Sequence, residues 1–283
     1  MVFIIILFIN YTLYIKVEFW YSINIMSWAS RRQFKYLAIV FGIFFLIVFW
    51  IIYPIIFKTP TCSDGKLNGD ETGVDCGGSC SRVCNSDVVS PVTVWSRAFP
   101  VVENIYNLVA YIENPNKNSA IAKANYEFRI YDVNNKLIGR REGSTFIPPN
   151  QQFVVFEPRF DLGESKIRSI SFEFIPPFIW QKKEPFVNIL PIKVDNVVLK
   201  NDYNLPTLTA RVKNESIYDI PSFDVIAILY DIDNNAINAS KTQKEGLESN
   251  GSLPVYFTWP EALIDTPVKN DVLVQINPFA ISF

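Results

Sequence analysis

The sequence predicts an all-β protein in which two similar β-sandwiches follow a membrane-spanning α-helix and a short disulfide-rich loop. Three observations carry this prediction. Residues 36–57 contain no charged side chain, all four cysteines lie within residues 62–84, and the chain beyond residue 88 repeats itself at an offset of 99 to 101 residues. We therefore expect a transmembrane helix at 36–57, a cysteine-rich stalk at 58–87, sandwiches at 88–177 and 186–283, and a linker between them at 178–185.

The composition limits what the protein can do. The chain of 283 residues contains no histidine, which excludes Ser-His-Asp and Cys-His catalysis and removes the commonest transition-metal ligand. Its net charge is −2, so no broad basic surface for nucleic acid is expected. Neither an enzyme nor a small-molecule substrate is indicated.

The uncharged stretch 36–57 is long enough to span a membrane. A helix rises 1.5 Å per residue, so this stretch covers the roughly 30 Å hydrocarbon core. Arg31, Arg32 and Lys35 precede it, and Lys58 follows it. The positive-inside rule therefore places the N-terminal side in the cytoplasm and the large C-terminal part outside.

The segment before the helix, residues 1–35, has several interpretations. Residues 1–15 are almost wholly apolar and fit a first membrane helix or a signal-peptide core, although no clear cleavage site follows. Alternatively, Met26 is the true start, and a short basic segment then precedes the helix. These alternatives stay open.

The cysteines Cys62, Cys76, Cys80 and Cys84 predict disulfides, because an exported chain folds in an oxidising compartment. A zinc knuckle is the rival interpretation, but the usual C-x2-C pairs and histidines are missing. Four cysteines allow three pairings. We prefer Cys62–Cys76 with Cys80–Cys84, because that pairing closes the acidic loop on itself.

Oxygen-bearing side chains cluster within this loop and predict a calcium site at Asp64, Asn68, Asp70 and Asp75. Ca²⁺ takes six to eight oxygen ligands, and interleaved glycines allow the sharp turns that such a loop needs. The EF-hand pattern is only half met, because Lys66 takes the place of an acidic ligand. The alternative is a solvated cluster in which Asp and Asn form turns.

The run D-G-x-x-N-G-x-E-T-x-V-D-C-G-G-x-C within residues 62–84 resembles a small cysteine-rich motif of bacterial surface proteins. It is also distantly similar to the calcium-binding thrombospondin type 3 repeat. The resemblance implies an extracellular stalk element and no enzymatic activity.

Short alternating strands are expected beyond residue 88. Residues 208–214 echo 108–114, and 230–235 echo 131–135, which indicates a tandem duplication of about 100 residues, the usual size of an immunoglobulin-like sandwich. In the first copy we predict strands at 92–98, 106–113, 124–132, 136–141, 152–157 and 168–175.

Each copy resembles the FxLYD-type β-sandwich family of bacterial envelope proteins. The signature stands as Phe128-Arg-Ile-Tyr-Asp132 and as Ala227-Ile-Leu-Tyr-Asp231. The second copy departs from it at Ala227, so another side chain, for which Phe223 is a candidate, must fill its core. The resemblance implies a sandwich fold with an extracytoplasmic binding or spacer role. We expect Asp132 and Asp231 to cap turns by accepting backbone N–H bonds.

The linker carries Phe178, Ile179 and Trp180, which are candidates for a partner-binding patch. The alternative is that these residues form the seam where the two sandwiches pack on each other.

These features favour a single-pass, membrane-anchored, non-enzymatic interaction or scaffold protein of a bacterial cell envelope, with the membrane and envelope proteins as partners. A second hypothesis is an accessory subunit of an export or surface-appendage complex. A third, a carboxylate-dependent envelope hydrolase, requires a cleft with two facing acidic side chains.

Overall fold

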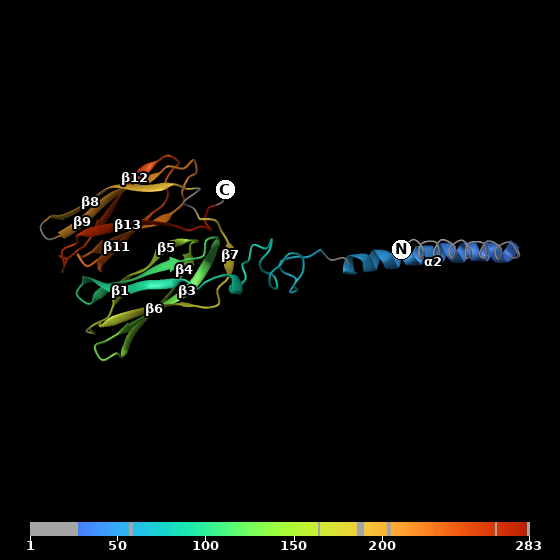
Figure 1. Ribbon diagram of the computed structural model, residues 1–283, viewed down its shortest axis with the longest axis horizontal. Helices are drawn as coiled ribbons and strands as arrows, with labels where there is room; N and C mark the ends of the chain where they lie inside the picture. The colour runs from blue at the N-terminus through green and yellow to red at the C-terminus, as the bar shows by residue number, and fades with distance from the viewer. Residues whose placement is uncertain are drawn as a thin grey trace, which may run out of the picture. The chain divides into compact units, whose positions relative to one another are not determined.

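The computed structural model describes residues 28–56, 59–163, 165–185, 190–202, 205–263 and 265–281 (Figure 1). The chain divides into two compact units, Met1–Pro60 and Thr61–Phe283. The interpretations of residues 1–15 and of Met26 fall outside the described residues.

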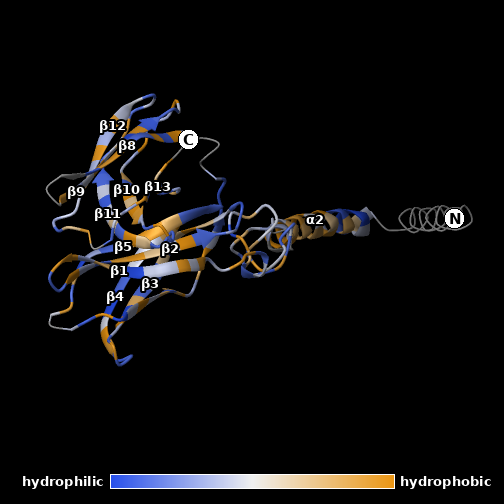
Figure 2. Cartoon of the chain, turned by 60° about the vertical axis from the view of Figure 1, so that its left-hand side comes forward, coloured by the Kyte–Doolittle hydropathy of each residue, from blue (hydrophilic) through white to orange (hydrophobic). Residues whose placement is uncertain are grey.

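The first unit contains helix α2 (Trp28–Ile56). It begins eight residues before the predicted start, so the basic residues Arg31, Arg32 and Lys35 form its first turns. In the described part of the chain, one helix, Trp28–Pro54, is long and apolar enough to cross a membrane. Figure 2 shows hydrophobic colours along most of α2. A signal anchor and a signal peptide share these properties.

The first sandwich consists of two antiparallel sheets. One sheet has the strand order β1-β2-β5, and the other has the order β4-β3-β6, with β7 paired to β3. The strands are β1 (Val92–Val102), β2 (Ile105–Asn114), β3 (Ser119–Tyr131), β4 (Leu137–Ile147), β5 (Gln151–Asp161), β6 (Ser169–Ile175) and β7 (Trp180–Lys182).

The second sandwich repeats this topology. Its sheets have the orders β12-β9-β8 and β11-β10-β13, which correspond strand by strand to β5-β2-β1 and β4-β3-β6. The strands are β8 (Ile192–Asp202), β9 (Leu205–Asn214), β10 (Phe223–Tyr230), β11 (Ala236–Lys244), β12 (Ser252–Thr258) and β13 (Lys269–Ile276). The protein is therefore mostly β, with paired antiparallel sheets like those of immunoglobulin-like sandwiches.

Each sandwich has its own core between its two sheets. In β3, Tyr126, Phe128 and Ile130 point inward, as the period-two alternation predicts. The corresponding core of the second copy contains Ala227 in place of Phe128, and Phe223 is buried in the same cluster. Phe223, at the start of β10, therefore supplies an aromatic ring to a core that has no counterpart of Phe128.

The predicted linker 178–185 is partly a strand. β7 pairs with Ser119–Ile121 of β3, so Trp180, Gln181 and Lys182 extend a sheet of the first sandwich. The 3₁₀ turn η1 (Asn85–Asp87) follows the cysteine-rich loop and precedes β1. Residues 180–182 of the predicted linker therefore belong to the first sandwich.

Candidate binding site at the junction of the two sandwiches

The cysteine-rich loop contains two disulfides, and our preferred pairing is wrong. Cys62 is bonded to Cys80, and Cys76 is bonded to Cys84. The physical reason is a tight turn in which Gly73 and Cys76 exchange backbone hydrogen bonds of 3.2 and 3.1 Å. This turn places the Cys76 sulfur beside Gly73 together with the Cys84 sulfur, away from Cys62.

Two glycines of the motif permit this crossed arrangement. Gly77 and Gly78 both have positive φ, +79° and +51°. A Cβ atom at Gly77 would lie 1.8 Å from the Thr72 hydroxyl, and one at Gly78 would lie 2.0 Å from the Asp70 carbonyl oxygen. Only glycine accommodates both the backbone conformation and the close approach. The D-C-G-G motif therefore has a structural explanation.

The predicted calcium ligands are only partly brought together. The Asn68 amide donates to Asp64 Oδ2 over 2.8 Å, and Asp75 accepts from the backbone N–H of Gly65, next to Asp64. Asp70 instead accepts from the Ser79 hydroxyl at 2.8 Å, and this bond lowers the pKa of Asp70. These carboxylates thus accept hydrogen bonds from within the loop, while the calcium interpretation stays a prediction.

The loop also packs against the first sandwich. The N–H of Val83 donates to the Trp180 carbonyl at 3.0 Å, and the N–H of Lys182 donates to the Ser81 carbonyl at 2.8 Å. The Lys182 ammonium donates to the Gly78 carbonyl. The loop is therefore joined by hydrogen bonds to β7 of the first sandwich.

The linker residues Phe178, Ile179 and Trp180 do not form the seam between the sandwiches. Trp180 is 2% exposed in the first core, where half-buried Phe178 packs beside it. Ile179 is 55% exposed. Trp180 is therefore a core residue, and Ile179 is the exposed member of the three.

The motif aspartates close equivalent turns in both copies. Asp132 Oδ1 accepts from the backbone N–H groups of Asn134 and Lys136, each at 2.8 Å. Asp231 Oδ1 accepts from those of Asp233 and Asn235 at 2.9 and 2.7 Å. The predicted role as turn caps is confirmed.

The real junction lies between the sheet β1-β2-β5 of the first sandwich and the sheet β11-β10-β13 of the second. A buried apolar cluster lies between these two sheets, and we call this cluster the junction. Its fully or nearly buried members are Phe99, Val109, Val154, Phe156, Ile226, Ile228, Tyr230, Ala236 and Ala239. Trp95 and Tyr111, stacked at 5.4 Å with an 8° interplanar angle, pack against its edge. Sheet packs on sheet, as in the interior of a domain.

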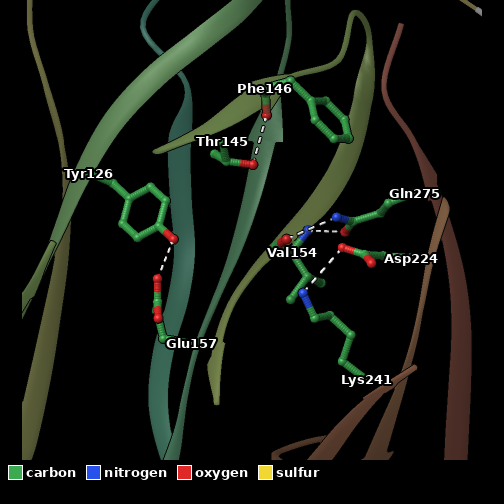
Figure 3. A network of polar contacts seen from close by, with 8 residues as sticks. All are labelled: Tyr126, Thr145, Phe146, Val154, Glu157, Asp224, Lys241 and Gln275. Atoms are coloured by element: carbon green, nitrogen blue, oxygen red, sulfur yellow. Dashed lines mark hydrogen bonds and ion pairs between the residues drawn. The ribbon is translucent and has the colours of Figure 1, made fainter. Parts of the chain in front are cut away.

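Polar contacts fix the register of the junction. The Gln275 side chain in β13 accepts from the N–H of Val154 and donates to its carbonyl at 3.0 Å (Figure 3). Val154 lies in β5, an edge strand, so Gln275 satisfies backbone groups that no neighbouring strand pairs. At the other side, Arg97 donates to the Ala236 carbonyl at 2.7 Å and to Asn235 Oδ1 at 3.1 Å.

A groove of about 450 Å³ opens beside Gln275, lined by both sandwiches. Lys241 lies 3.2 Å from Asp224 and 6.0 Å from the Phe156 ring centroid. On the first sandwich, the Tyr126 hydroxyl donates to Glu157 Oε1 at 2.6 Å (Figure 3).

The Tyr126–Glu157 pair closes the core beneath this groove. Arg141 Nε donates to the other Glu157 oxygen at 2.8 Å. Burial, followed by the hydrogen bond to Glu157, raises the pKa of Tyr126. Gly143 permits the pair, because a Cβ there would lie 2.4 Å from the Tyr126 hydroxyl. Tyr126 is thus held neutral as a donor, and Glu157 accepts hydrogen bonds from both Tyr126 and Arg141.

A second groove, of about 590 Å³, lies on the other side of the junction. Arg97, Arg168, Asp231 and Asp265 are among its lining residues. Hydrogen bonds from the Asn235 backbone, and less strongly its side chain, lower the pKa of Asp231. Asp231 is therefore ionised, and it caps its own turn. Both grooves present small sets of charged groups suited to binding.

The sequence contains a signal for the junction. Counting back from the equivalent tyrosines Tyr131 and Tyr230, Glu127 and Arg129 of β3 correspond to Ile226 and Ile228 of β10. The continuous apolar run in β10 indicates a strand covered on both faces, whereas β3 alternates.

Comparisons with known proteins identify no family. Neither a protein-family model nor a curated protein matches the chain. Similar solved structures include a transglutaminase of red sea bream, with a TM-score of 0.20 and 11% identity over 65% of this chain and 29% of that chain. A β-glucuronidase from glycoside hydrolase family 2 has a TM-score of 0.24 and 11% identity over 79% of this chain and 28% of that one. The chain spans less than a third of either protein.

Proposed function

We propose that this protein is a non-enzymatic, membrane-anchored interaction protein of a bacterial cell envelope, with the unit Thr61–Phe283 outside the cytoplasm. The observation that carries the proposal is the junction. Two sandwiches that share a buried apolar cluster form one body with fixed outer faces, which is what a scaffold or binding module requires.

The position of the disulfides supports the location. Both follow α2, and disulfides persist in oxidising compartments. The basic residues Arg31 and Arg32 at the start of α2 favour a cytoplasmic N-terminal side. A helix that anchors, rather than one that is cleaved, keeps the sandwiches at the membrane surface.

The state of the acidic groups supports a binding role over hydrolysis. Glycoside hydrolysis needs two carboxyl groups free to face a substrate, one of which carries a proton. At the junction, Glu157 accepts from Tyr126 and Arg141, and Asp224 pairs with Lys241. Asp231 is held by its own turn. These carboxylates are occupied by contacts within the chain.

The topology is tested by adding protease to intact cells and then to lysed cells. We expect digestion beyond residue 60 in intact cells and protection of the N-terminal side. Full protection of residues 90–283 would overturn the proposal. Blue-native gels of mildly solubilised membranes separate the two non-enzymatic roles, because a discrete large complex containing this chain favours the accessory-subunit role.

Uncleaved anchoring is tested by the N-terminal peptide of the purified native protein. We expect α2 to be retained. A mature chain that begins beyond residue 57 would show that the helix is a signal peptide, and the membrane-anchored role would then be wrong.

A further inference from the structure

The outer face of the sheet β12-β9-β8 points away from the junction and carries an excess of basic side chains. Lys193 lies opposite Lys213 in the β8–β9 ladder, and Asp195 lies opposite Arg211. Val212, between Arg211 and Lys213, is fully buried, and Val194, between Lys193 and Asp195, packs against the same core, so alternation directs the three basic side chains outward. Lys200 extends the same row. We refer to this surface as the basic face.

The charges on the basic face are poorly balanced. Two lysines directly opposite each other on a sheet repel, which costs stability. In the described parts of the chain, Lys213 pairs with Glu215 at 3.0 Å, whereas Lys193, Lys200 and Arg211 have no carboxylate within 4.0 Å. Among the side chains that the structure describes, four basic groups on this face meet two acidic ones, Asp195 and Glu215.

The opposite outer face, on the sheet β4-β3-β6, is balanced. Glu127 pairs with Arg129 and lies 3.5 Å from Arg140, and Arg129 also contacts Glu173 at 2.9 Å. Both are outer faces of the paired sandwiches, and the arginines of the β4-β3-β6 face have carboxylate partners within 4.0 Å. The uncompensated cations of the basic face therefore match an anionic partner.

The basic face also carries groups that suit sugars. Tyr256, 61% exposed, lies opposite Thr209 at the middle of the β9–β12 ladder. Thr207 and Thr258 lie opposite each other next to this pair. An exposed aromatic ring offers a flat apolar surface for a sugar ring, and the hydroxyls can donate and accept hydrogen bonds.

The dimensions favour a polymer. From Lys213 to Thr207, the position opposite Lys200, the strand advances about 20 Å at ~3.4 Å per residue. The cations are thus spread along the strands of a flat face.

We propose that the basic face binds an extended acidic polysaccharide outside the cell. The cations contact its carboxylate or sulfate groups, and Tyr256 packs on a sugar ring. This inference rests on the proposed function, because it requires the face to be extracytoplasmic. An anionic lipid surface fits less well, because membrane binding gains most from a cluster of apolar side chains that insert together. Tyr256 is instead flanked by threonines, and Val198, 45% exposed, lies across Thr209 from it.

The test uses the full chain in nanodiscs of uncharged phosphatidylcholine. The probes are alginate, which carries carboxylates, and chondroitin sulfate, with neutral dextran as the control polymer. We expect at least one acidic polymer to bind at low salt, binding to weaken as sodium chloride rises, and dextran not to bind.

Variants identify the surface. Lys193→Gln with Arg211→Gln should weaken binding about tenfold, and Tyr256→Ala should weaken it at every salt concentration. The matched control, Lys123→Gln with Lys136→Gln, removes two exposed lysines of the first sandwich and should leave binding unchanged. Unaltered melting temperatures confirm that each variant is folded.

Several results would overturn the inference. These are no binding of either acidic polymer, equal losses in the test and control variants, or tighter binding to phosphatidylglycerol vesicles or duplex DNA. Because protease accessibility is measured separately, an extracellular chain that fails to bind these polymers refutes this inference and leaves the proposed function standing.

Discussion

We expect that the junction can be opened without unfolding either sandwich. The first copy shows which side chains the equivalent face carries when no second sheet packs on it. We consider the double variant Ile226→Glu with Ile228→Arg, which gives β10 the residues that β3 has at the equivalent positions, Glu127 and Arg129. In β3 these two form an ion pair at the outer face. The first sandwich therefore already contains this pair of charged residues at the equivalent strand positions.

The magnitude follows from burial. Ile226 and Ile228 are each 0% exposed. Full burial of an isoleucine is worth roughly 1.5–3 kcal/mol, so the two contribute about 3–6 kcal/mol to the junction. Keeping the junction closed would also place two charges in an apolar cluster, which costs several kcal/mol more. We expect the sandwiches to separate.

Calorimetry and limited trypsin digestion measure the separation. The wild-type unit should unfold in one cooperative transition, and the variant should show two transitions at lower temperature and faster cleavage at Lys183. The control, Ser252→Glu with Thr258→Arg, places the same charges on exposed positions of β12. A variant that melted like the wild type and resisted trypsin would show that the junction contributes little, and the reasoning would be wrong.

Four further outcomes are expected. Peptide mapping without reduction should recover the two crossed disulfides; either of the other two pairings in the native protein would contradict the structure. Tyr126→Phe should lower the free energy of unfolding in urea by about 1–2 kcal/mol, because buried Glu157 loses a donor. Trp180→Ala should cost about 3–5 kcal/mol and accelerate proteolysis of the cysteine-rich loop. The Asn235 backbone lowers the pKa of Asp231, so its stabilisation is present above about pH 4 and lost on acidification; Asp231→Asn should therefore flatten the decline in melting temperature below that pH.

The sequence predicted the repeated elements well, because their signals are local. The alternation of Tyr126, Phe128 and Ile130 and the turns at Asp132 and Asp231 depend on residues within a few positions of one another. The stretch at 36–57 is likewise defined by its own composition, although the helix begins earlier, at Trp28.

What the sequence could not supply depends on contacts between distant segments. Trp180 looked like an exposed linker aromatic, but β7 pairs with Ser119–Ile121, about sixty residues away, and this buries it. The disulfide pairing depends on turns at Gly73 and Gly77 rather than on cysteine spacing. The grooves arise only when the sandwiches pack.

The junction is made by two different faces, one from each copy, and this has a consequence for assembly. A contact between unlike faces can in principle be repeated indefinitely, so a chain of such domains could grow into a fibre. Here the two remaining faces carry Glu127 and Arg129 on one side and Arg211 and Lys213 on the other. These charged outer faces act as caps, as the terminal repeats of solenoid proteins do. A further sandwich could not repeat the apolar junction on either outer face without burying these charges.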